Sequence, residues 1–155
     1  MRTSASVAVG LVAFVALAAA QDRRPGARTP STSTVWDGVY TDQQADRGQQ
    51  MYRRTCAKCH LSDLTGGEHS GGADGEVPPP LVGPEFIEHW NDRSLSELFL
   101  AIKRGMPLDT PGALPAPAYA DLLGFLLKMN DMPAGTRELP SDPASIEAIR
   151  ITPRP

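Results

Sequence analysis

The most chemically informative part of the sequence is the run Cys56-Ala57-Lys58-Cys59-His60, which holds the only two cysteines among 155 residues. Two thiols separated by two residues and followed at once by a histidine form the attachment pattern of c-type haem. On a helical segment this spacing matches the two porphyrin vinyl groups, and the imidazole that follows reaches the iron. The run therefore predicts one covalent haem c, bound through Cys56 and Cys59, with His60 as an axial iron ligand.

Three other chemistries are open to a cysteine pair. A thioredoxin-like redox pair needs βαβ surroundings, and no strand pattern is visible here. A zinc site needs two further ligands, which His69 or His89 would have to supply with His60, and no second pair at zinc-finger spacing exists. A simple disulfide, the usual state of two cysteines outside the cytoplasm, leaves the adjoining histidine unexplained.

The N-terminus has the features of an export signal. Arg2 gives it a positive charge, residues 7–20 are apolar and uncharged, and three alanines end at Ala20. The apolar run is shorter than the roughly 20 residues of a spanning helix. Residues 1–20 therefore predict a signal peptide cleaved near Ala20, a periplasmic protein and a mature chain without a stable membrane span.

Composition divides the rest of the chain. Residues 21–35 are rich in Pro, Ser and Thr and predict a disordered tether, followed by one domain over residues 36–130. Residues 131–155 form a Pro-rich extension with a short docking helix expected over 143–150. The net charge of −3 lacks the basic excess of a nucleic-acid binder, so no nucleic-acid partner is expected.

The elements that must position the cysteines and the histidine are helices. Capping patterns at Thr41 with Gln44 and at Ser94 with Glu97 predict two helix starts, and Gly105 predicts the end of the second helix. Apolar periodicity predicts a third helix over about 117–130, and a shorter helical turn is expected over 85–90. The fold class is therefore all-α, with three or four helices and long loops, and the haem would fill the core.

With these elements in place, the sequence resembles the class I, mitochondrial-type cytochromes c over residues 36 to about 132. The resemblance rests on five features: CAKCH, Gly48 and Tyr52 before it, and, after it in chain order, PPPLVG, Gly105-Met106-Pro107 and the aromatic-Leu helix from Tyr119. Its local sequence is most similar to that of small bacterial cytochromes that serve quinoprotein dehydrogenases. The family implies a small all-α cytochrome c fold around one haem, with Gly48 at the crossing of the first and last helices.

The resemblance also implies the second axial ligand. Met106 follows a helix end and precedes Pro107, as in the Met-Pro position of the family. The other methionines fit less well: Met1 is removed, Met51 is too close to the haem segment, and Met129 and Met132 end a helix. A histidine ligand remains the alternative, from His89 in an apolar turn or His69 in a Gly-rich loop. The family further implies that the carbonyl of Pro79 or Pro80 accepts a hydrogen bond from His60.

A haem with histidine and methionine ligands has no open coordination position and a raised potential. The sequence therefore predicts an electron-transfer protein and not an enzyme, carrying single electrons between a dehydrogenase donor and an oxidase or other respiratory acceptor. Two alternatives stay open. In the first, the chain is a fixed haem subunit of a dehydrogenase or oxidase complex. In the second, Met106 is not a ligand, and the chain is a haem enzyme or sensor whose iron has an open coordination position.

Basic residues gather near the predicted haem site. Arg53, Arg54 and Lys58 surround the attachment run, and Lys103-Arg104 precedes Met106. Ordinary solvated helix faces would also explain this pattern. As a functional surface, it predicts a basic rim that docks on an acidic patch of a redox partner.

Overall fold

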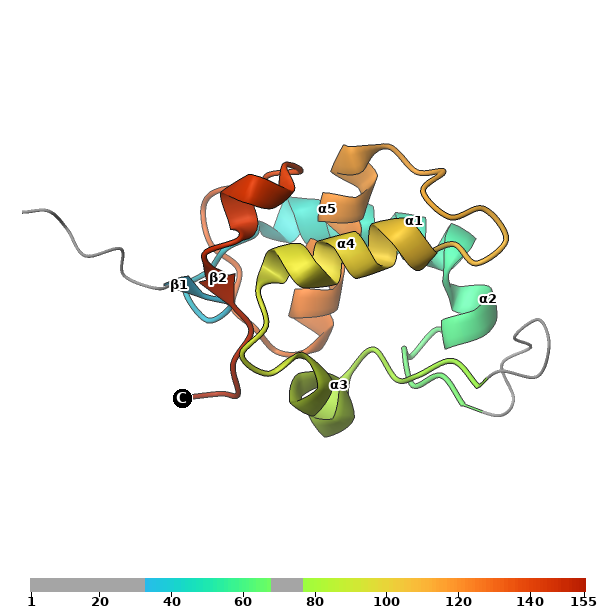
Figure 1. Cartoon of the computed structure of the whole chain (residues 1–155), viewed down its shortest axis with the longest axis horizontal. Coiled ribbons are helices and arrows are strands. Elements are labelled where there is room, and N and C mark those ends of the chain that lie inside the picture. The colour runs from blue at the N-terminus through green and yellow to red at the C-terminus, as the bar shows by residue number, and fades with distance from the viewer. Residues whose placement is uncertain (1–32, 68–76) are drawn as a thin grey trace, which may run out of the picture. The chain divides into compact units, whose positions relative to one another are not determined.

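The structure is a computed structural model that describes residues 33–67 and 77–155. The predicted signal peptide, most of the predicted tether and His69 lie outside these residues. The helices of the described part are α1 (Asp42–Thr55), α2 (Ala57–His60), α3 (Gly83–Trp90), α4 (Leu95–Gly105) and α5 (Ala116–Met129). Figure 1 shows α1, α4 and α5 packed together, with α2 and α3 at their edges. The predicted helical fold class is confirmed.

The two helix starts that the capping patterns predict are present. The Ser94 hydroxyl accepts a hydrogen bond from the Glu97 amide, and the Glu97 carboxylate accepts one from the Ser94 amide, so this capping box is complete. Thr41 likewise accepts from the Gln44 amide at 3.2 Å. The Gln44 side chain, however, bonds to the backbone of Leu139 instead of returning to Thr41. The box at Thr41 is therefore only half formed.

The first and last helices cross at Gly48, as the resemblance implies. A Cβ on Gly48 would overlap the backbone carbonyl of Asp121 and approach the side chain of Phe125. Further along the crossing, the rings of Tyr52 and Phe125 lie 5.2 Å apart between centroids. This close approach packs α1 against the apolar face of α5, and the cysteine run follows directly from the end of α1.

The C-terminal segment (residues 131–155) packs on the same core as the helices. Its short helix is a 3-10 turn, Pro143–Ile146, which is shorter than the helix expected over 143–150. The chain then enters strand β2 (Ile149–Arg150), which pairs in parallel with β1 (Ser33–Thr34). No strand is predicted from the sequence. These strands have two residues each, too few to leave a period-two pattern.

Buried side chains fasten this segment to α1 and to the turn before α4. Ile146 and Ile151 are fully buried. Gln44 donates to the Leu139 carbonyl at 2.9 Å and accepts from its amide at 2.7 Å. At the other end, the amide of Asp92 donates to Ile151, whose own amide donates to the Arg93 carbonyl. The segment therefore closes the core on the side away from the cysteines.

Candidate functional site

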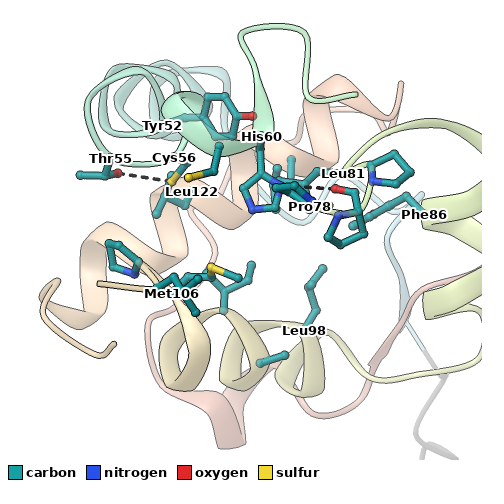
Figure 2. A pocket seen from close by; sticks show the side chains of 18 of the residues that line it. Tyr52, Thr55, Cys56, His60, Pro78, Leu81, Phe86, Leu98, Met106 and Leu122 are labelled. Carbon is teal, nitrogen blue, oxygen red and sulfur yellow. Dashed lines mark hydrogen bonds between the residues drawn. The ribbon is translucent and has the colours of Figure 1, made fainter. Parts of the chain in front are cut away.

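A cavity of about 720 Å³ lies between the end of α1 with α2 on one side and α3 with α4 on the other. This volume is in the upper part of the range of about 300–1,000 Å³ for ligand and cofactor sites. Its walls are mostly apolar and include Leu81, Phe86, Leu98 and Leu122, as Figure 2 shows. A large, mostly apolar group fits such walls.

The cysteine run has the helical geometry that its chemistry requires. Cys56 caps α1 through a bond from its amide to the Tyr52 carbonyl, and its own carbonyl accepts from the amides of Cys59 and His60. Both cysteines are partly buried and line the cavity. Burial raises the pKa of the Cys56 thiol, and a contact of 3.3 Å with the Thr55 hydroxyl opposes that shift.

The imidazole of His60 is held in one orientation. Its Nδ1 lies 3.3 Å from the carbonyl oxygen of Pro79. Because a carbonyl only accepts hydrogen bonds, Nδ1 carries the proton and Nε2 keeps its lone pair. Burial lowers the pKa of His60, with the Pro79 bond acting in the opposite direction, so the neutral ring is favoured. Of the two prolines proposed from the sequence, the structure selects Pro79.

Met106 enters the cavity from the wall opposite His60, as Figure 2 shows. It follows the last residue of α4, and its amide still bonds to the Ile102 carbonyl at 2.8 Å. Met51, Met129 and Met132 do not line the cavity. The arrangement therefore places one imidazole and one thioether on facing sides of the cavity, with the two thiols beside the imidazole.

His89 also lines the cavity, from α3, but its side chain is exposed and lies edge-on to Trp90 at 5.1 Å between ring centroids. It therefore remains a second nitrogen donor near the site. Within residues 33–67 and 77–155, no group of three or more His, Cys, Asp or Glu side chains is placed to hold a metal ion. The zinc alternative thus finds no ligand set in the described part of the chain.

The loop that carries Met106 is fastened by Tyr119 and by an ion pair of Lys58 with Asp109, and the sequence predicted no role at the site for Tyr119 or Asp109. The Tyr119 hydroxyl donates to the Met106 carbonyl at 3.0 Å. Lys58, inside the cysteine run, forms an ion pair of 2.9 Å with Asp109. The periodicity placed Tyr119 on the apolar face of α5, where it is indeed buried, but nothing in the pattern signals its hydroxyl bond.

The basic residues near the site differ in their surroundings. Arg53 and Arg54 are exposed at the end of α1. Lys58 already has a partner, and its hydrogen bond to Asp109 lowers the pKa of that carboxyl. Two exposed apolar side chains, Val77 and Leu108, also line the cavity. The cavity lining therefore combines exposed apolar side chains with the charged Lys58, Asp109 and Glu85, and Arg53 and Arg54 are not part of that lining.

Comparison with known proteins adds one finding. A family model described as cytochrome c oxidase, cbb3-type, subunit III matches residues 43–126, just over half of the chain. The matched range contains both cysteines, His60 and Met106. No curated protein and no solved structure matches the chain. In the described residues, no helix is long and apolar enough to cross a membrane.

Proposed function

The chain belongs to this cbb3-type cytochrome family and is a c-type cytochrome with a covalently bound haem c; on that premise we propose which residues hold the haem and what the protein does with it. Cys56 and Cys59 form the two thioethers, and His60 and Met106 are the axial iron ligands. The observation that supports this assignment is the placement of His60 and Met106 on facing walls of the cavity beside the cysteines.

The bound haem supplies a one-electron redox couple. The chain's own residues tune that couple. Pro79 orients His60 and leaves Nε2 available, while a thioether ligand from Met106 raises the potential. Apolar walls around Phe86, Leu98 and Leu122 keep water from the ring. With His60 and Met106 both bound to its iron, the haem would transfer single electrons and offer no position for a substrate.

We further propose that the protein is exported to the periplasm and is similar to the class I cytochromes c. There it carries single electrons from a dehydrogenase, of the quinoprotein type, to a respiratory acceptor. Docking beside the cavity is supported by the exposed Val77 and Leu108, which line it, and by the exposed Arg53 and Arg54, which lie in the last turn of α1 just before the cysteine run. Charge would guide the encounter, and the apolar side chains would be covered in the complex.

A second candidate function is favoured by the family description, which names an oxidase subunit. In that case the chain stays bound within a larger oxidoreductase complex and passes electrons inside it. The two functions use the same haem site. They differ in whether the cytochrome dissociates from its partner between transfers.

The ligand assignment is tested with Met106→Ala and, in parallel, His89→Ala. Met106→Ala should lose the far-red sulfur-to-iron absorption band, lower the potential and bind carbon monoxide, which the unaltered protein resists. His89→Ala should keep the spectrum of the unaltered protein. The opposite result, with His89→Ala altering a low-spin spectrum that Met106→Ala leaves intact, would assign the ligand to His89.

A further inference from the structure

We propose that Tyr119 is the positioning residue for Met106, because its hydroxyl holds the backbone of the loop over residues 106–114 from inside the core. The proposal rests on the proposed ligation of iron by Met106. Helix α5 carries no iron ligand itself, but through Tyr119 it keeps the Met106 thioether on the wall opposite His60. The apolar periodicity of the sequence places Tyr119 only on the apolar face of that helix.

The Tyr119 hydroxyl contacts both ends of the loop. It donates to the Met106 carbonyl at 3.0 Å and accepts from the Leu114 amide at 3.4 Å. The side chain is almost fully buried, with 1% of its surface exposed, and its ring packs against Phe99 at 6.2 Å between centroids. A buried, rigid ring with two partners fixes the start and the end of the loop relative to α5.

The remaining fastenings of the loop are weaker. The residues between Leu108 and Ala113 are exposed. The ion pair between Lys58 and Asp109 lies on the surface, with about 60% of each side chain exposed, and such pairs contribute little in water. Inside the loop, the amide of Gly112 reaches the Met106 carbonyl only at 3.5 Å. The amide of Met106 is held by α4 through its 2.8 Å bond to Ile102, and the bond from Tyr119 is the main restraint that reaches Met106 from outside α4 and the loop itself.

Tyr119→Phe is the test variant, because it removes the hydroxyl and keeps the ring contact with Phe99. The chain offers a matched control. Tyr40 is also 1% exposed and also donates to the backbone carbonyl of a methionine, Met132, at 2.6 Å. Tyr40 does not line the cavity. Tyr40→Phe therefore removes an equivalent buried hydrogen bond at a place that does not touch the loop.

The holoprotein is measured in two ways. Amide hydrogen exchange, read by mass spectrometry over residues 107–114, reports opening of the loop without reference to the iron. Binding of imidazole to the oxidised protein reports how often Met106 leaves its position. A lost intramolecular hydrogen bond corresponds to a change of about fivefold. We expect both exchange in the loop and imidazole binding to quicken about fivefold in Tyr119→Phe, and neither to change in Tyr40→Phe.

The outcomes separate this proposal from the proposed function. If the unaltered protein lacks the far-red sulfur-to-iron band, Met106 is not the ligand and the proposed function fails at that point. If the band is present and Tyr119→Phe behaves like Tyr40→Phe in both measurements, Tyr119 is an ordinary core residue and the positioning role is overturned. A fivefold change in both measurements, specific to Tyr119→Phe, supports it.

Discussion

Gly48 on α1 lies so close to the backbone carbonyl of Asp121 on α5 that no Cβ fits between the two helices. The obstacle is a backbone atom, so a side-chain rearrangement cannot relieve it. Since α1 leads directly into the cysteine run, the separation of these two helices also sets where the cysteines lie relative to the core.

Gly48→Ala should therefore destabilise the protein. Overpacking costs about 1–3 kcal/mol, and the upper end applies because the clash is with backbone. The better helix propensity of alanine offsets about 1 kcal/mol of this. We expect the free energy of unfolding of the holoprotein to fall by about 2 kcal/mol in denaturant titrations.

Gly124→Ala on α5 is the control for Gly48→Ala. Its added methyl group would meet Gln44 and Tyr40 at an ordinary contact distance of 3.5 Å. This variant should be as stable as the unaltered protein or slightly more stable. Equal losses in the two variants would show that the crossing at Gly48 is not specially tight.

Covalent attachment is tested on the protein produced in a strain with haem-attachment machinery. The intact mass should exceed the polypeptide mass by one haem, and the colour should survive acid–acetone extraction. The double variant Cys56→Ala, Cys59→Ala should lose its colour on extraction, whereas Met106→Ala should keep it, because a thioether bond does not depend on the axial ligand. A colourless product from the unaltered sequence would falsify the attachment.

Docking at the cavity edge predicts a salt-dependent electron transfer. Charges steer the encounter over about 8–10 Å at physiological salt, so the second-order rate measured by stopped flow should fall as salt rises. Because Lys58 is paired with Asp109, reversing the charges of Arg53 and Arg54 should account for most of the effect. The double change to glutamate should slow transfer at least about tenfold at low salt, with spectrum and potential nearly unchanged.

Arg137→Glu provides the comparison, because Arg137 is an exposed basic residue of the C-terminal segment, whereas Arg53 and Arg54 lie directly before the cysteine run. It should leave the rate within about twofold of the unaltered value, as one charge away from the docking edge contributes little to steering. A rate that is indifferent both to salt and to Arg53 and Arg54 would count against a shuttle and in favour of a fixed subunit.

The packing of the C-terminal segment predicts a loss of stability when its buried side chains are shortened. Ile146 is fully buried, so Ile146→Ala should lower the free energy of unfolding by about 2–4 kcal/mol. Met129, on the last turn of α5, is 39% exposed, and Met129→Ala should cost less than about 1 kcal/mol. Thermal unfolding followed by far-UV circular dichroism checks both, and similar shifts for the two variants would contradict the packing.

Local signals in the sequence predicted well what depends on neighbours along the chain. The complete capping box of Ser94 and Glu97 is one example, and the helical cysteine run is another. Pairings across long distances left no such signal. Gln44 was expected to cap its own helix, yet it bonds to Leu139, which is 95 residues away. Polar partners of this kind are decided only when distant segments pack together.

The same limit applies to the candidate site. The facing walls that carry His60 and Met106 follow from a motif and a helix end that can be read directly. The hydroxyl of Tyr119 and the carboxylate of Asp109 reach the site from positions whose residue types suit an apolar helix face and a loop. Their contacts depend on the path of the loop over residues 106–114, which periodicity does not describe.

The pairing of β1 with β2 has a practical consequence for attaching this protein to a solid support. Ser33 is aligned with Ile149, so the first described residues and the C-terminal residues leave from the same corner. In Figure 1 that corner lies at the other end of the view from α2, and neither strand lines the cavity. An affinity tag or electrode linker joined after Pro155 would hold the cytochrome with the haem edge turned toward the solution. Voltammetry of such a film would then sample the edge that a natural partner meets.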